Sequence, residues 1–190
     1  MRIFRIERKA SRNLHPTRTV LLLGALIASM AIYAAASDPP LATVPRVELN
    51  RYLGRWYEIA RYPNRFEKQC ARDVTATYTL RQDGKISVLN ACIKQDGALN
   101  EGKGWAKVVD TNTNAKLKVT FFWPFFGDYW VLELGHNYEY AVVGEPSRKY
   151  LWILSRTSHI SDGQYSEILG RLAAKGYNAA KLIRVPQTAH

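Results

Sequence analysis

The sequence is poor in cysteine, with two in 190 residues, and it contains no run of five or six basic side chains. Two cysteines exclude a disulfide-dense miniprotein and a four-cysteine zinc site. Without a basic run, the phosphate attraction that nucleic-acid-binding proteins use has little to act on. The four histidines form no recognisable triad or metal-ligand spacing. We therefore expect no metal, no cofactor and no nucleic-acid partner, and we assign no catalytic residue.

Apolar and aromatic residues are abundant instead. Hydrophobic residues make up 47% of the chain, which includes eleven tyrosines, six phenylalanines and five tryptophans. This composition excludes wholesale disorder, and the length allows little more than one core. Aromatic side chains suit strands and apolar pockets. One globular domain with an apolar interior is the resulting expectation.

Residues 1–36 have the pattern of a secretory signal peptide. Residues 1–18 hold six basic side chains and one acidic side chain, and the apolar residues 20–36 end in three alanines. A basic segment, an apolar segment and small residues before the cleavage point characterise such signals, which predicts cleavage after Ala36. The alternative is an uncleaved anchor, because 17 apolar residues lie at the lower limit for a membrane span. We expect export to the periplasm, free or associated with the outer membrane.

Removing this leader lowers the net charge from +11 to +6, because 21 basic and 15 acidic residues remain. The first cysteine is Cys70, far beyond the apolar segment, so no lipoprotein cysteine is present. Residues 37–46 contain three prolines and no periodicity, which indicates an extended linker. The folded domain is predicted to span residues 47–186.

Short segments rich in β-branched and aromatic residues recur through this domain, as in antiparallel all-β proteins. Asp83 and Gly84 predict a two-residue hairpin turn between the second and third strands. Hairpin-length connections favour an eight-stranded up-and-down barrel over a sandwich, since a barrel has no exposed edges. The predicted strands span residues 54–61, 73–80, 85–92, 103–110, 116–122, 129–134, 139–144 and 150–156.

After the eighth strand the hydrophobic period changes to that of a helix. Ser161 and Gln164 form a capping-box pattern, and Ile168 and Leu172 continue an apolar face. Gly176 is predicted to end this amphipathic helix, and residues 181–185 read as one more short strand.

Several segments resemble the lipocalin family. Residues 49–62, LNRYLGRWYEIARY, resemble the first lipocalin strand with its Gly-x-Trp motif at Gly54–Trp56. FFWPFFGDYWVLEL at 121–134 looks like an aromatic loop of bacterial lipocalins, and YLWILSRT at 150–157 resembles their last barrel strand. The resemblance implies that Arg156 stacks on Trp56 at the closed end of the barrel. Many bacterial relatives carry a lipid-modified cysteine, which this sequence lacks.

In such a barrel Cys70 and Cys92 both lie near the open mouth. We predict a disulfide there, which an oxidising compartment would maintain; free thiols are the alternative. An apolar rim of Phe66 and residues 123–126 suggests a membrane or protein contact, with the protein a monomer or a homodimer.

Strand alternation assigns a set of residues to the interior, where small, polar and apolar side chains suggest a ligand pocket. The predicted ligand-binding residues are Phe66, Ala76, Tyr78, Val88, Asn90, Val119, Phe121, Tyr129, Val131, Tyr150 and Trp152.

The favoured function is binding of one small hydrophobic ligand, with fatty acids or lysophospholipids implied by the family resemblance, in cell-envelope lipid maintenance. Two alternatives remain open. One is a lipid-directed enzyme or thiol redox protein acting through Glu58 or a free cysteine. The other is a protein-interaction module whose barrel is filled by its own side chains.

Overall fold

Alternation of apolar and polar residues produces the main strands of the molecule. The computed structural model describes residues 40–188. Its strands are β1 (Gly54–Arg61), β2 (Cys70–Leu80), β3 (Ile86–Lys94), β4 (Leu99–Val108), β5 (Lys116–Phe122), β6 (Phe125–Leu134), β7 (Tyr140–Gly144), β8 (Leu151–Ser155) and the short β9 (Ile183–Arg184).

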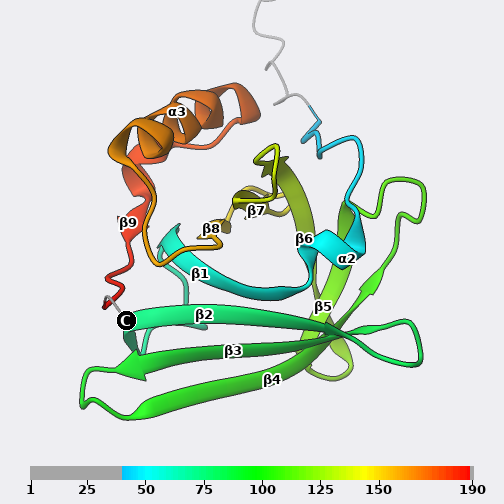
Figure 1. The fold of residues 1–190 in the computed structure, drawn as a ribbon, viewed down its shortest axis with the longest axis horizontal. Helices are drawn as coiled ribbons and strands as arrows, with labels where there is room; N and C mark the ends of the chain where they lie inside the picture. Colours follow the sequence, from blue (N-terminus) through cyan, green and yellow to red (C-terminus); the bar gives the residue numbers. More distant parts are fainter. Residues whose placement is uncertain (1–39, 189–190) are drawn as a thin grey trace, which may run out of the picture. The chain divides into compact units, whose positions relative to one another are not determined.

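The eight main strands close into an antiparallel barrel (Figure 1). Each strand from β2 to β8 pairs with the next along the chain, and β1 pairs with both β8 and β2. The predicted fold class is therefore confirmed. β9 adds to the edge of β1 where β1 diverges from β2.

Strand boundaries agree with the prediction for β1 and β5, whereas β2, β4 and β6 begin earlier. The turn between β2 and β3 corrects the sequence analysis. Gly84 alone has a positive φ, of 76°, and Arg81 N–H donates to the Lys85 carbonyl at 2.8 Å. Three residues therefore form this loop, and a two-residue turn with two positive φ angles does not.

One helix packs on the outside of the barrel. Helix α3 (Asp162–Leu172) begins at Ser161, whose Oγ accepts from Gln164 N–H at 3.2 Å. It continues into the 3-10 turn η2 (Ala173–Lys175) and ends at Gly176, which has a φ of 76°. Ile168 and Leu172 are fully buried against the outer faces of β7, β8 and neighbouring strands. A second 3-10 turn, η3 (Ala179–Lys181), leads into β9.

The predicted leader, residues 1–36, lies outside the described residues. Part of the predicted linker needs a correction, because it packs on the barrel. Leu41 is buried in the cluster beneath α3, and Val44 N–H donates to the Val131 carbonyl at 3.0 Å. Within residues 40–188 the helices are all too short or too polar to cross a membrane.

Candidate functional site

The two ends of the barrel differ, and the closed end is sealed by a stacked cation. The short helix α2 (Leu49–Tyr52) crosses this end, and Trp56 below it is completely buried. The Arg156 guanidinium lies 3.7 Å from the centroid of the Trp56 ring. It also donates hydrogen bonds to the carbonyls of Arg51 and Arg55. The contact implied by the lipocalin resemblance is therefore present.

Three tyrosine hydroxyls meet inside the barrel above Trp56, and we call them the tyrosine floor. Tyr129 Oη lies 2.7 Å from Tyr52 Oη and 3.0 Å from Tyr78 Oη. Burial raises the pKa of Tyr78 to about 12 and raises the pKa values of Tyr52 and Tyr129 well above 10. The three phenols are therefore neutral hydrogen-bonding groups at physiological pH.

Above this floor the interior, or lumen, is lined by small residues. Strand register places Ala76 opposite Asn90 and Asn90 opposite Gly102. These three residues are only half-buried although their strand positions face inward, which indicates accessible space inside the barrel. The buried Asn90 Oδ1 has no hydrogen-bond partner within the described residues. The wall at this level therefore offers accessible space beside a buried acceptor that has no partner among the described residues.

A second glycine, Gly104, lies in the same wall of the barrel. Gly104 faces inward opposite Val88, and the Phe121 ring lies against Gly102 and Gly104. A Cβ atom at Gly104 would lie only 2.8 Å from the Phe121 ring and 2.4 Å from the Thr120 carbonyl oxygen. Glycine is required there because β4 and the Phe121 ring approach so closely.

Three charged residues and one tryptophan gather inside the barrel near the open mouth, in a group that we call the mouth cluster: Glu58, Arg61, Glu67 and Trp152. Arg61 Nη1 donates to Glu58 Oε1 at 2.7 Å, and Arg61 Nε lies 3.1 Å from Glu67 Oε2. Trp152 Nε1 donates to the Glu67 carboxylate at 3.2 Å. One guanidinium thus serves two carboxylates.

Desolvation raises the pKa of Glu58 well above 4.5, and the negative charge of Glu67 raises it further. Arg61 opposes this shift but is shared with Glu67. Burial therefore favours the protonated form of Glu58 more than it would for an exposed glutamate. The loop that carries Glu67 spans residues 62–69 and forms a lid held to the barrel wall by these contacts.

A disulfide and a C-terminal segment complete the mouth. Cys70 and Cys92 are bonded, as predicted, and these are the chain's two cysteines, so the free-thiol alternative is excluded. Residues 183–188, the C-terminal strap, fill the gap between β1 and β2. Gln187 Nε2 in this strap donates to the carbonyls of Glu58 and Val74 at 2.8 and 3.0 Å.

Large apolar side chains surround the mouth in solvent. Phe122, Trp123 and Phe125 in the β5–β6 turn are each exposed by 77–79%. Phe66 in the lid and Leu99 at the start of β4 are also exposed. An exposed apolar group of this size is typical of a contact surface.

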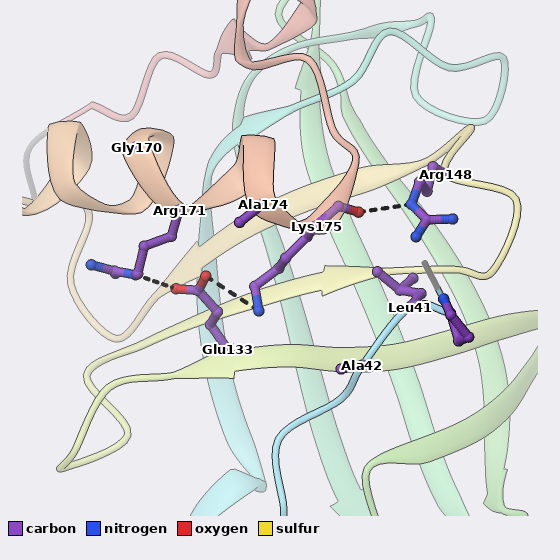
Figure 2. Close-up of a pocket in the computed structure, with 9 residues that line it drawn as sticks. Leu41, Ala42, Glu133, Arg148, Gly170, Arg171, Ala174 and Lys175 are labelled. Carbon is purple, nitrogen blue, oxygen red and sulfur yellow. Dashed lines mark hydrogen bonds and ion pairs between the residues drawn. The ribbon is translucent and has the colours of Figure 1, made fainter. Parts of the chain in front are cut away.

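A separate cavity of about 430 Å³ lies on the outer surface, between α3, η2 and residues 40–42 (Figure 2). Glu133 projects from β6 and is nine-tenths buried; its Oε2 accepts from Arg171 Nε at 3.0 Å, and its Oε1 lies 3.7 Å from Lys175 Nζ. These contacts attach the helical segment to the barrel. The cavity does not involve the residues that the sequence assigned to ligand binding.

Comparison with known proteins agrees with this architecture. A family model described as a lipocalin-like domain matches residues 47–187. The chain belongs to the lipocalin family. Outer membrane lipoprotein Blc of Escherichia coli (strain K12) is 41% identical over 174 residues, which cover 90% of this chain and 98% of that protein.

A plant lipocalin is similar to this chain in sequence, and an insect protein is similar to it in fold. Temperature-induced lipocalin-1 of Arabidopsis thaliana is 41% identical over 156 residues, covering 78% of this chain and 83% of the relative. The structure of insecticyanin from Manduca sexta gives a TM-score of 0.65 at 22% identity, covering 80% of this chain and 87% of that chain. This last likeness supports the fold alone.

Most of the predicted ligand-binding residues face the interior of the barrel. Inward-facing members of the set are Ala76, Tyr78, Val88, Asn90, Val119, Phe121, Tyr129, Val131 and Trp152. Phe66 and Tyr150 lie outside this group at the mouth, where their ring centroids are 5.6 Å apart. Tyr150 also stacks on Trp152.

Sequence reasoning did not find Arg61 or Glu67. A register shift in the β1–β8 pairing between Glu58 and Ala60 turns Ala60 outward and brings Arg61 inward, opposite Trp152. Strict alternation from Trp56 gives the opposite assignment for Ala60 and Arg61. Nothing in the local sequence marks the shift.

Proposed function

We propose that this lipocalin binds one small hydrophobic ligand in its lumen, with fatty acids and lysophospholipids as the ligand classes. The carrying observation is that inward-facing residues differ in burial. Trp56 and Val131 are fully buried, whereas inward-facing Ala76, Asn90 and Val119 are only half-buried. An eight-stranded barrel has room for one such ligand.

An acyl chain suits this lumen because most of its wall is apolar. Each buried CH₂ group contributes about 0.8 kcal/mol, so a long chain offsets the cost of association. We place the polar head at the mouth, beside the lid and the mouth cluster. Membership of the lipocalin family and the similarity to outer membrane lipoprotein Blc support binding over catalysis.

The proposal also covers the location of the protein in the cell and its contact with a membrane. Similarity to outer membrane lipoprotein Blc and the signal-peptide pattern support a role in the cell envelope, at or near the outer membrane. The exposed rim of Phe66, Phe122, Trp123 and Phe125 would contact the membrane from which ligand is taken. As a monomer or a homodimer, the protein would store or carry lipid for envelope maintenance.

The test is native mass spectrometry of detergent-free protein, followed by titration with palmitate and with a lysophospholipid. We expect one ligand per chain. Ala76→Trp places an indole in the lumen and should weaken uptake at least tenfold. Thr79→Trp places the same indole on the exposed outer face of β2 and serves as the matched control.

Gly102→Leu provides a second lumen variant, because its Cβ would meet only the Phe121 ring, at 3.8 Å. It should weaken uptake like Ala76→Trp while the fold is kept. Wild-type protein that takes up neither ligand would contradict the proposal and favour the filled-barrel interaction module. Turnover of a lipid that Glu58→Gln abolishes would favour the enzyme instead.

A further inference from the structure

The outer surface of β4 and β5 carries lysines and aromatic rings side by side. Ala106 and Leu117 belong to the interior cluster, so strand alternation turns their neighbours outward. We call this surface the basic–aromatic face; it consists of Lys85, Trp105, Lys107, Lys116, Lys118 and Phe126. It lies outside the lumen and has no part in the ligand pocket.

Some lysines of this face lie close together although like charges repel. Lys107 lies directly opposite Lys118 in the β4–β5 pairing, and like charges in that arrangement are destabilising. Asp128 relieves Lys118 at 2.9 Å, and Asp83 pairs with Lys85 at 3.1 Å. Lys107 makes no ion pair within residues 40–188. The face therefore keeps a net positive charge.

Aromatic rings also contact the ammonium groups of this face. The Lys107 ammonium lies 5.2 Å from the centroid of the Phe126 ring, and Lys85 lies 5.0 Å from that of Trp105. The two rings pack edge to face with centroids 5.1 Å apart. Cation–π contacts hold the ammonium groups without neutralising their charge. Lys107, which has no acidic partner among the described residues, thus remains available to an external anion.

This face is continuous with the apolar rim at the mouth. Lys118 of this face lies on β5 and Phe126 on β6, and the β5–β6 turn with Phe122 and Trp123 joins these two strands. One flank of the barrel therefore presents exposed apolar rings at its tip and ammonium groups behind them. Interfacial membrane-binding surfaces combine apolar insertion and basic groups in this way.

We propose that the basic–aromatic face binds the anionic headgroups of a lipid bilayer while the β5–β6 turn enters its surface. This inference rests on the membrane contact in the proposed function and adds the lipid charge class and the flank that faces the membrane. Lysines close to an anionic surface each contribute about a fivefold gain in binding. A soluble anion would use the lysines but leave Phe122, Trp123 and Phe125 in water.

The test is co-sedimentation of residues 37–190, which contain the whole barrel, with vesicles. Phosphatidylcholine vesicles with and without phosphatidylglycerol are compared. Lys107→Gln/Lys118→Gln should lower the partition coefficient on anionic vesicles about thirtyfold. Arg46→Gln/Lys181→Gln removes two exposed cations from other surfaces and should change it less than threefold. Binding should also weaken as the salt concentration rises.

A variant of the β5–β6 turn separates apolar insertion from binding of anionic headgroups. Phe122→Ser/Phe125→Ser should reduce binding to both kinds of vesicle, whereas the lysine variant should reduce binding to the anionic kind alone. Ligand uptake without vesicles should be unchanged in the lysine variant. A failure of the wild-type protein to take up ligand would therefore contradict the proposed function of the lumen and leave the membrane-binding face untouched. Equal losses for the lysine variant and the Arg46/Lys181 control would overturn the assignment.

Discussion

Arg61 is the residue on which the interior of the mouth depends. Its guanidinium is almost fully buried and contacts two carboxylates, one from its own strand and one from the lid. A buried charge without a partner is far more costly than a paired one. Arg61 thus ties Glu67 of the lid to the barrel wall, while burial and the charge of Glu67 raise the pKa of Glu58.

Glu58 should make stability depend on pH. Because its pKa is higher in the folded state than in the unfolded state, its stabilising contribution is complete below the unfolded pKa, near 4.5, and is lost as the pH rises through the folded pKa. Glu58→Gln should therefore become progressively more stable relative to wild type from acid to neutral pH. Urea denaturation across that range measures the difference.

The control is Glu101→Gln, which removes one carboxylate from an exposed position on β4. A wild-type and Glu58→Gln pair whose free energies of unfolding stay parallel across the pH range would show that the pKa of Glu58 is the same in the folded and unfolded states.

Arg156 should contribute to stability through its geometry as well as its charge. Arg156→Ala removes the contact with the Trp56 ring and two hydrogen bonds to backbone carbonyls, and should lower the free energy of unfolding by about 2 kcal/mol. Arg156→Lys should recover about half of that loss. Arg55→Ala, an exposed arginine at the same end, should have little effect, and a similar loss there would show that the ring contact is unimportant.

Among the elements, the mouth end of β2 relies on a covalent bond and the C-terminal strap. β2 pairs irregularly with β3 between Cys70 and Thr75, and it pairs with β1 only from Thr75 onward. The disulfide joins it to β3, and Asp73 N–H donates to the Pro186 carbonyl in the strap. Few ladder hydrogen bonds are left to hold this segment unaided.

Cys70→Ala/Cys92→Ala should therefore lower the free energy of unfolding by about 3 kcal/mol, since the bond closes a loop with a sequence separation of 22. Denaturant titration measures this change. Reductant should lower wild-type stability by a similar amount and leave the variant unchanged. Equal stability of the two proteins without reductant would mean that the bond adds no constraint.

The sequence predicted the ends of strands unevenly. The bounds of β1 and β5 were predicted to the residue, although the pairing of each contains a register shift, and the shift in β1 reversed the predicted faces of Ala60 and Arg61. The start of β2 was missed because its pairing with β3 is bulged there. The packing of Leu41 on the barrel was missed because a proline-rich segment has no periodicity to reveal a docking site. Closed-end residues such as Trp56 and Arg156 were found because a family motif marks them.

For the whole molecule, ligand binding and stability should be coupled. A ligand that binds only the folded barrel stabilises it by RT ln(1 + [L]/Kd), about 2.7 kcal/mol at a hundredfold excess over Kd. The midpoint of thermal unfolding should therefore rise with the logarithm of the lysophospholipid concentration. The midpoint of Ala76→Trp should stay constant, while that of Thr79→Trp should follow wild type. A rise of the same size in Ala76→Trp would place the binding site outside the lumen.

The pairing of the first barrel strand has a consequence for biosynthesis. β1 needs β8 and β9 as neighbours, and about 90 residues separate the end of β1 from the start of β8. At ribosomal speed, roughly 5–20 residues per second, the first strand waits several seconds for its partners to be translated. During that time the barrel cannot close, so the nascent chain stays unfolded enough to pass through a narrow channel. A secretion channel that accepts only unfolded polypeptide could therefore export this chain before it folds. The barrel would then close on the other side of the membrane, when β8 and β9 have emerged.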